Sequence, residues 1–386
     1  MSDIVSLIIG LSTYLILGFY MYSLGECAQN GVTLRIKKVR LMDPNIIVSI
    51  LLFSLICGLR YHTGTDCEHY VNQFEHIVKT GINANEYDEP LFTAFTWLVV
   101  KVHGGRILYL ALIACAQLTL FYSAFITRKY LYPFLGIVLI LGPHFLNFNN
   151  GLRQMLVACM FVVAVQQLID HKRVLLFLLM ILLGATIHSS AFILLLAVPL
   201  IWYDGFVNSR IAVAGVVISI LIANLGVLDP LLANADGIMY LMGYDSYAER
   251  MDYYVGMEAQ ITHYGPRRIF QIVSYFLIIF YSERMKDFYK KDRLFRVSYL
   301  LFLLYICLFE MLSLKNLLFT RPLLYLTPFW LIISAYLLCY LKKTGKTFGF
   351  WISLIMLCSY SVLASIAEFQ DPGASSLYRY IFFQDL

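Results

Sequence analysis

The stretch IIVSILLFSLICGLRYHTGTDCEHY, residues 46–70, decides the fold class. Its first part, Ile46 to Leu59, is an apolar run, and its second part, Arg60 to Tyr70, is dense in charged, histidine and tyrosine side chains. The apolar run is expected to be a helix in lipid, because backbone N–H and C=O groups must there be hydrogen-bonded within the segment. Ionisable residues beside such a run are costly to place in lipid, so they are where function is sought first.

The same apolar pattern recurs along the whole chain, which is 60% hydrophobic with a mean hydropathy of +0.74. About twelve runs approach the roughly 20 residues that a bilayer crossing needs. We predict an all-α polytopic integral membrane protein with one transmembrane domain over residues 1–386 and no soluble domain. The predicted spans are 4–22, 44–59, 107–126, 131–149, 152–170, 174–187, 190–203, 211–228, 268–282, 298–314, 322–340 and 348–367.

Two regions depart from simple spans. The segment 89–102 is short and polar at both ends, and we predict a re-entrant or interfacial helix. Segments 174–187 and 190–203 are predicted as helices that meet at the polar sequence Thr186–Ser190. The first run is expected to be a retained span, because the residues before it lack the positive charge and cleavage pattern of a signal peptide.

Basic residues in short loops predict the orientation. Placing the compact clusters 128–129 and 172–173 inside puts both termini outside, with two longer outer (periplasmic) loops at about 60–88 and 229–267. In a rival topology, 89–103 crosses the membrane and 174–203 is a single span. That topology places nearly as many basic residues inside, so the total count leaves both open.

The remaining composition excludes several classes of function. The net charge of +5 is spread over short loops, which argues against nucleic acid as a partner. The eight cysteines include no CxxC pair, so we expect structural thiols and no metal site.

Several arginines are predicted on the outer side, where the positive-inside rule does not require them. A guanidinium fork suits phosphate, so this set suggests an anionic ligand. Pairing with local carboxylates or lipid headgroups is the alternative for each member. The set comprises Arg60, Arg153, Arg250, Arg267, Arg268 and Arg321.

The polar stretch after Arg60 reads as the start of an amphipathic helix. Thr65 and Glu68 have the spacing of a capping box. Tyr70, Phe74, Ile77 and Val78 then follow at helical spacing, which predicts an interfacial helix. Asp66 would lie in the first turn, where the helix dipole favours an acid, or it would act as a base. His62 and His69 are read as ordinary interfacial residues or as bases.

Three further positions carry polar residues at helix ends. Arg153 and Gln154 open an apolar span, where a cation opposes the helix dipole, so an anion or an acid from another loop is expected. His188 lies between two apolar helices, either as a functional group or as a neutral histidine bonded to freed backbone. Arg321-Pro322 and Glu89-Pro90 each start a helix, with proline near the first position.

The order of these motifs resembles a known family. It runs Arg60…Gly64-Thr-Asp66…Tyr70, Glu89-Pro-Leu-Phe92, Leu152-Arg153-Gln154, Ile187-His-Ser-Ser-Ala191 and Arg321…Tyr325. This order is similar to that of the EpsG-like branch of Wzy-type bacterial O-antigen and exopolysaccharide polymerases. The resemblance covers about residues 44–330. Cys67 and Pro90-Leu91 depart from the family pattern, but neither departure removes a charged group.

The resemblance implies a polymerase that joins undecaprenyl-pyrophosphate-linked repeat units at the outer face of the bacterial inner membrane. It implies an inverting transfer with a pyrophosphate leaving group, no cofactor and no bound metal. The implied partners are the lipid-linked glycans and the bilayer; a chain-length regulator is left open. Asp66 or His188 is the implied base. Arg60, Arg153 and Arg321 are assigned to pyrophosphate, and Tyr70, Glu89, Gln154 and Tyr325 to substrate or to neighbouring side chains.

Three other functions fit the same composition. A polytopic lipid-linked-sugar glycosyltransferase would also place acids in the first outer loop. A polysaccharide flippase or transporter would use the arginines to line a pathway, although such proteins tend to show internal repeats, and none is evident. An O-antigen ligase would differ only in its acceptor.

Overall fold

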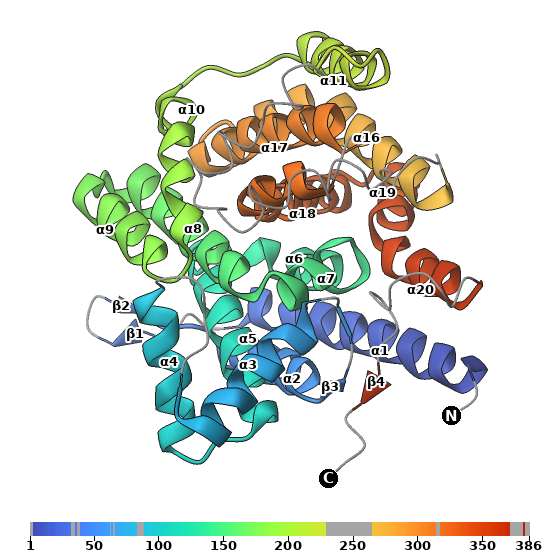
Figure 1. Ribbon diagram of the computed structural model, residues 1–386. Helices are drawn as coiled ribbons and strands as arrows, with labels where there is room; N and C mark the ends of the chain where they lie inside the picture. The colour runs from blue at the N-terminus through green and yellow to red at the C-terminus, as the bar shows by residue number, and fades with distance from the viewer. Residues whose placement is uncertain are drawn as a thin grey trace.

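The computed structural model describes residues 3–31, 35–36, 39–61, 63–64, 66–82, 89–228, 265–313, 317–370 and 381–382, which are predominantly helical (Figure 1). Among these residues, four two-residue strands form two antiparallel pairs. In the first, β1 (Arg35–Ile36) pairs with β2 (Val39–Arg40), and in the second, β3 (Arg60–Tyr61) pairs with β4 (Ile381–Phe382). The helices are α1 (Asp3–Asn30), α2 (Pro44–Gly58), α3 (Cys67–Thr80), α4 (Pro90–Lys101), α5 (Arg106–Ser123), η1 (Lys129–Leu131), α6 (Tyr132–Leu141), α7 (His144–Asn150), α8 (Leu152–His171), α9 (Val174–Ala185), η2 (Ser189–Ala197), α10 (Val198–Trp202), α11 (Ser209–Asn224), α16 (Pro266–Phe288), α17 (Arg293–Leu312), η3 (Leu317–Leu326), α18 (Thr327–Lys343), α19 (Thr347–Cys358) and α20 (Tyr360–Gln370).

The helices follow the predicted apolar runs closely. Within the described residues, six helical segments are long and apolar enough to cross a membrane, and a seventh is if a bent pair counts as one span. Five shorter apolar helices, of 10–17 residues, accompany them. An all-helical, multi-pass architecture is therefore confirmed. The count of twelve spans and the placement of the longer loops outside stay predictions.

One predicted span is not a straight helix. Residues 131–149 form η1 and α6, followed by α7 at a bend of 71°. Gly142 is extended at φ −81° and ψ −174°, and Pro143, which has no N–H to donate, stands before α7. The run is therefore not one continuous helix, because a glycine–proline pair interrupts helical hydrogen bonding even within an apolar run, and its prediction as a single span stays a prediction.

Other predicted helices are partly 3-10 or divided. Residues 190–203 fall in the 3-10 helix η2 and the short α10, and Pro322 lies inside the 3-10 helix η3, not at the first position of an α-helix. The run 348–367 divides into α19 and α20 at Ser359. The 89–102 segment forms a single helix, α4, and its re-entrant or interfacial placement stays a prediction.

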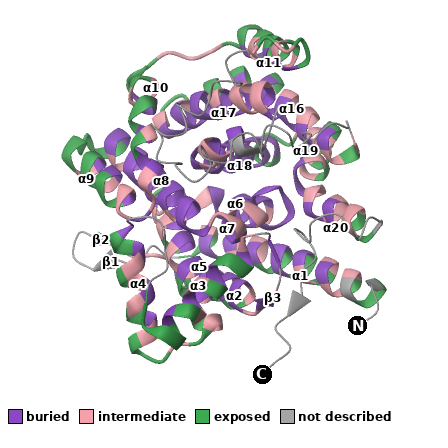
Figure 2. Ribbon diagram, viewed as in Figure 1, coloured by how far each residue is buried: buried purple, intermediate pink, exposed green. Residues whose placement is uncertain are grey.

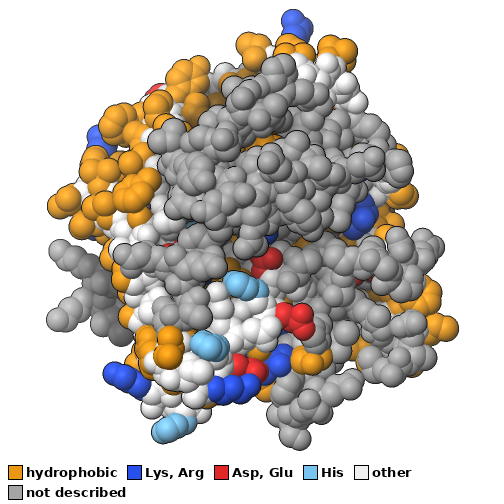
Figure 3. Space-filling view, in the orientation of Figure 1, with side chains coloured by type: hydrophobic (Ala, Val, Ile, Leu, Met, Phe, Trp, Pro, Cys, Tyr) orange, Lys and Arg blue, Asp and Glu red, His pale blue; other side chains and the backbone are white. Residues whose placement is uncertain are grey.

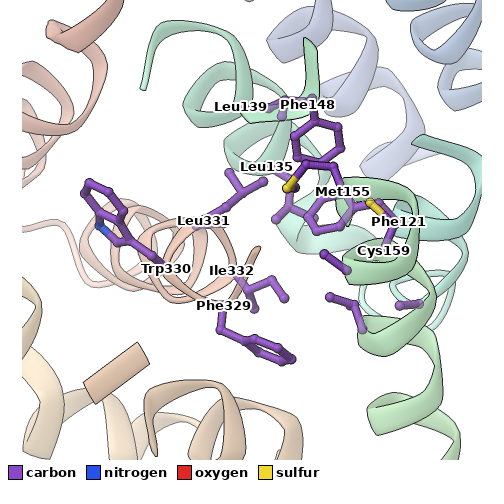
Figure 4. Close-up of a cluster of buried hydrophobic side chains, with 14 of the residues drawn as sticks. Phe121, Leu135, Leu139, Phe148, Met155, Cys159, Phe329, Trp330, Leu331 and Ile332 are labelled. Atoms are coloured by element: carbon purple, nitrogen blue, oxygen red, sulfur yellow. The ribbon is translucent and has the colours of Figure 1, made fainter. Parts of the chain in front are cut away.

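The core is built around α18, which runs through the centre of the bundle (Figures 1 and 2). Every residue of α18 from Thr327 to Leu341 is buried. Figure 4 shows Leu331 and Ile332 of α18 on the side that faces Leu135 of α6 and Met155 of α8. Residues of the helices α6, α8 and α18 therefore belong to one buried hydrophobic core.

Small residues allow α1 and α6 to pack closely. A Cβ at Gly136 of α6 would lie 2.9 Å from the carbonyl oxygen of Met21. A Cβ at Gly25 of α1 would lie 2.6 Å from the Cα of Pro133. Lipid gives helices little hydrophobic reason to associate, so close backbone packing of this kind is a main source of helix–helix affinity in membranes.

The surface divides by chemistry. Hydrophobic side chains gather around the rim of the view in Figure 3, whereas charged and histidine side chains gather in the lower part of the visible face. Leu175 of α9 is 71% exposed and Leu196 of η2 is 77% exposed. Such exposed leucines are what a lipid-facing belt requires.

Candidate functional site

Glu89 lies at the centre of the candidate site. It is the residue before Pro90 at the start of α4, and its side chain is fully buried. One carboxylate oxygen accepts a hydrogen bond from Nη1 of Arg153, and the other lies 2.7 Å from Nδ1 of His188. The backbone N–H of Leu91 also donates to the carbonyl of Thr186 at 3.0 Å. This backbone bond holds the start of α4 against the end of α9, and so holds Glu89 against His188.

Arg153 lies in the first turn of α8 and is buried. Its guanidinium carbon lies 5.4 Å from the centre of the Tyr70 ring and 5.7 Å from that of Phe92. The aromatic faces and the Glu89 carboxylate stabilise a cation that the helix dipole disfavours. The sequence predicted an anion or an acid from another loop at this point, and the structure supplies an acid.

His188 lies at the junction of α9 and η2, with extended backbone. Its ring centre is 6.3 Å from that of Tyr325, and the Tyr325 hydroxyl is 2.9 Å from Oγ of Ser190. The side chain of His188 is 16% exposed, whereas that of Glu89 is 0% exposed. The histidine therefore connects the buried carboxylate to the surface.

Gln154, Arg321 and Asp66 form the more open part of the site. The side-chain amide of Gln154 donates to the carbonyl of Arg321 at 2.7 Å, which ties η3 to the start of α8. Nη2 of Arg321 lies 3.9 Å from Oδ1 of Asp66, a loose contact between side chains that are 39% and 30% exposed. This pair is the part of the site best placed to meet a ligand from solvent.

Arg60 was assigned to pyrophosphate, but it does not lie where a ligand would reach it. It is fully buried. Nη1 donates to the carbonyl of Cys57 at 2.8 Å and to Oδ1 of Asn149 at 2.7 Å, and Nη2 donates to the carbonyl of Asn149 at 3.1 Å. The guanidinium is thus engaged with the protein interior, and this geometry does not favour direct contact with pyrophosphate.

The helix predicted after the polar stretch is α3. Tyr70, Phe74 and Ile77 are buried on one face, whereas Val78 is 53% exposed and does not belong to that face. Asp66 is the residue that caps α3, not part of its first turn, and its side chain makes no capping hydrogen bond. His62 and Thr65 lie outside the described residues.

The electrostatics of Glu89 follow from its partners. Burial by itself would raise the pKa of this carboxyl, but the hydrogen bond from His188 and the positive charge of Arg153 outweigh it. The pKa of Glu89 is accordingly lowered from its usual value. Glu89 is therefore ionised near neutral pH and acts as an acceptor for both neighbours.

Other members of the outer arginine set lie elsewhere. Arg268 of α16 is buried and donates to Glu310 of α17 at 2.5 Å and to Ser313 at 3.2 Å. Arg267 is partly exposed at the start of α16. Arg250 and most of the predicted loop 229–267 lie outside the described residues. Within the described ranges, no three His, Cys, Asp or Glu side chains are grouped so that they could hold a metal ion.

Three polar residues near the site received no individual role from the sequence. Asn150 accepts a hydrogen bond from the backbone N–H of Asp66 at 2.8 Å. Asn149 bonds to Arg60, and Gln117 of α5 donates to the carbonyl of Leu152 at 3.0 Å. Asn149 and Asn150 are the last residues of α7, where asparagine is an ordinary feature, so only their partners, which are distant in sequence, reveal what they hold.

The structure thus brings eight of the nine predicted site residues, from five segments, into one contact network, and places Arg60 behind it. Whether they act on substrate stays a prediction. Residues 45–382 match the model of the EpsG family. Neither a curated protein nor a solved structure matches the chain.

Proposed function

The chain belongs to the EpsG family, and we propose that it polymerises polysaccharide by joining lipid-linked oligosaccharide repeat units. The observation that carries this proposal is the Glu89 carboxylate, which holds Arg153 and His188 together beside the Asp66–Arg321 pair. A positioned base beside arginines is what glycosyl transfer from a pyrophosphate donor requires. The proposed donor and acceptor are undecaprenyl-pyrophosphate-linked repeat units at the outer face of the bacterial inner membrane.

In the proposed reaction, His188 is the base. A carboxylate can only accept, so the 2.7 Å contact with Glu89 places the proton of a neutral His188 on Nδ1. Nε2 is then free of a proton and takes one from the acceptor hydroxyl. The hydroxyl oxygen bonds to the anomeric carbon, and the bond from that carbon to the pyrophosphate oxygen breaks with its electron pair. Direct displacement inverts the anomeric configuration.

The leaving pyrophosphate develops negative charge that needs compensation. Arg321 is the most exposed cation of the network, and its guanidinium lies 3.9 Å from the Asp66 carboxylate, so an incoming phosphate can compete with that carboxylate for it. Arg153 adds positive charge behind it, next to Gln154, whose amide fixes the backbone of Arg321. Asp66 is assigned to orienting Arg321, which leaves His188 as the base.

Two other functions remain as outcomes of the test. A single-sugar glycosyltransferase would use the same base and arginines on a different acceptor. A flippase or transporter would need the arginines for binding only, with no role for a base. The Glu89–His188 contact suits a general base in glycosyl transfer, but carboxylate–histidine pairs also relay protons in transporters, so the glycan test decides between the two functions.

The test is the length of surface glycan in a strain that lacks this protein. We expect wild type to restore the ladder of long chains, and Arg153→Ala to leave only a single-repeat band. Arg173→Ala, at an exposed arginine bonded to Gln167, is the matched control and should restore the ladder. Membrane levels of each variant are measured in parallel.

The outcomes separate the functions. Loss of the ladder with retention of the single-repeat band identifies a polymerase. Loss of the single-repeat band as well would point to a flippase or an earlier glycosyltransferase. A normal ladder from Arg153→Ala would remove Arg153 from the site.

A further inference from the structure

We propose that Asn149 and Asn150, at the end of α7, are positioning residues that clamp the Arg60–Asp66 segment to the start of α8, and that Arg60 acts through this clamp without touching pyrophosphate. This inference rests on the proposed function and names residues that hold its site together. The clamp joins segments 89 and 84 residues apart in the sequence.

The first half of the clamp is the Arg60–Asn149 pair. Arg60 is fully buried, Asn149 is 1% exposed, and two donor groups of the guanidinium bond to two oxygens of Asn149. The amide nitrogen of Asn149 donates to Phe145, one turn earlier in α7, at 2.9 Å. Both sides of the asparagine amide are therefore used, which fixes its orientation as well as its position.

The second half of the clamp is Asn150. Its Oδ1 accepts the backbone N–H of Asp66, and the Cβ of any residue replacing Gly64 would lie 3.1 Å from the same oxygen. Gly64 has φ +88°, a conformation that favours glycine. The chain therefore passes close over Asn150 and turns so that Asp66 meets Arg321.

The clamp sits where small displacements matter for the reaction. Arg153 follows Asn150 by three residues, and the bond from Gln117 to the Leu152 carbonyl holds the first residue of α8. Asp66, whose side chain faces Arg321, is held by its backbone N–H, which donates to Asn150. Asn149 and Asn150 thus link the segment that orients Arg321 to the helix that carries Arg153. A misplacement of about 1 Å can cost roughly 100-fold in rate.

Two readings of Arg60 make opposite predictions for Asn149→Asp. If Arg60 acts through the clamp, Asn149→Asp keeps the acceptor oxygen for Arg60 but loses the donor to the Phe145 carbonyl, so it is more active than Asn149→Ala without a rise in KM. If Arg60 binds pyrophosphate, a new carboxylate competes for its guanidinium and raises KM. Arg60→Lys tests the same point, because an ammonium cannot reproduce the guanidinium's fork of bonds.

The experiment measures kcat and KM with the lipid-linked repeat unit extracted from the deletion strain. We expect Asn149→Ala to lower kcat about 10-fold or more, with KM changed less than about 3-fold, and Asn149→Asp to recover part of the loss, because it keeps the acceptor for Arg60 but not the donor to Phe145. Arg60→Lys should resemble Asn149→Ala. Asn208→Ala, at the capping asparagine of α11, is the matched control and should leave kcat unchanged.

The failure of this inference differs from the failure of the proposed function. If the wild-type protein does not polymerise the extracted substrate, the proposed function falls. If wild type is active but the kcat of Asn149→Asp is as low as that of Asn149→Ala, the proposed clamp is wrong. It is also wrong if either variant raises KM and leaves kcat unchanged. Should the Asn149 variants fail to accumulate, Asn150→Ala and Asn150→Asp decide by the same criterion, because the aspartate keeps an acceptor for the Asp66 N–H.

Discussion

The two ends of α8 carry two contrasting polar clusters. Arg153 lies in its first turn, in the candidate site, and Asp170 lies in its last turn, about 25 Å away along the helix axis. At the Asp170 end, Arg128 donates through Nε, Nη1 and Nη2 to both Asp170 and Asp292, at 2.7–3.1 Å. The hydroxyls of Tyr130 and Tyr336 donate to Asp292 as well.

The difference lies in how tightly the charged groups are hydrogen-bonded. The Arg128 guanidinium donates to two carboxylates through all three of its nitrogens. In the candidate site, one buried carboxylate is shared between Arg153 and His188, and Arg321 keeps a loose 3.9 Å contact with Asp66. A cluster that is tightly hydrogen-bonded within the protein fixes helices, whereas a partly exposed pair at a longer distance can exchange a protein partner for a ligand.

The largest expected effect on the stability of the protein comes from breaking the Arg128 cluster. Arg128→Ala leaves Asp170 and Asp292 without their cation, and we expect a loss of stability on the order of 3 kcal/mol, since Arg128 is buried and the carboxylates are mostly so. The amount of folded protein in the membrane should fall sharply. The amount of folded Arg153→Ala protein in the membrane should fall less, because His188 remains as a partner of Glu89. Equal losses for the two variants would contradict the distinction between the clusters.

The largest expected effect on turnover comes from removing the proposed base, His188. His188→Ala should lower kcat by about 100- to 10,000-fold with KM little changed, because general-base catalysis contributes that much. His188→Gln is the paired variant: it can still bond to Glu89 but cannot take a proton at this position. Measured turnover in His188→Gln close to wild type would mean that another group, with Asp66 first in line, is the base.

A smaller effect is expected at the open end of the site. Arg321→Ala should raise KM for the lipid-linked donor about 10-fold, as one charge-assisted contact is lost, and Arg321→Lys should recover part of it. Titration of the initial rate against donor concentration gives both constants. A fall in kcat with no change in KM would place Arg321 at the transition state only.

The smallest effect is a pH dependence. The pKa of Glu89 is lowered in the folded protein, so its stabilising contribution is present above the unfolded value and is lost as pH falls through the folded value, below about 4.5. The difference in thermal midpoint between wild type and Glu89→Gln should therefore be largest at neutral pH. It should become smaller as the pH is lowered below about 4.5. A difference that stays constant down to pH 3 would show that the charge of Glu89 does not stabilise the fold.

Local features of the sequence predicted much of the bundle. Most helix positions agree within a few residues, because apolar length and capping residues are local properties. The exceptions are also local in cause: Gly142-Pro143 bends one run, and Pro322 lies in a 3-10 helix. The orientation of the chain and the number of its spans remain predictions from charge and hydropathy.

The site was predicted as a set of residues and not as an arrangement. The sequence singled out Glu89, Arg153 and His188 because ionisable groups at helix ends are costly in lipid. It could not pair them, since Glu89 lies 64 residues from Arg153 and 99 from His188. The Arg128 cluster escaped notice because Arg128 was read as an inner-loop charge.

What the sequence determined by itself is the class of protein: an apolar chain of helices, the EpsG-type order of motifs, and the polar residues that interrupt it. The tertiary structure alone decided that Glu89 joins Arg153 to His188, and that Arg60 faces Asn149 in the interior. The physical reason is range. Helices form from bonds between residues four apart, whereas contacts between helices depend on how separate surfaces fit, which no local pattern encodes.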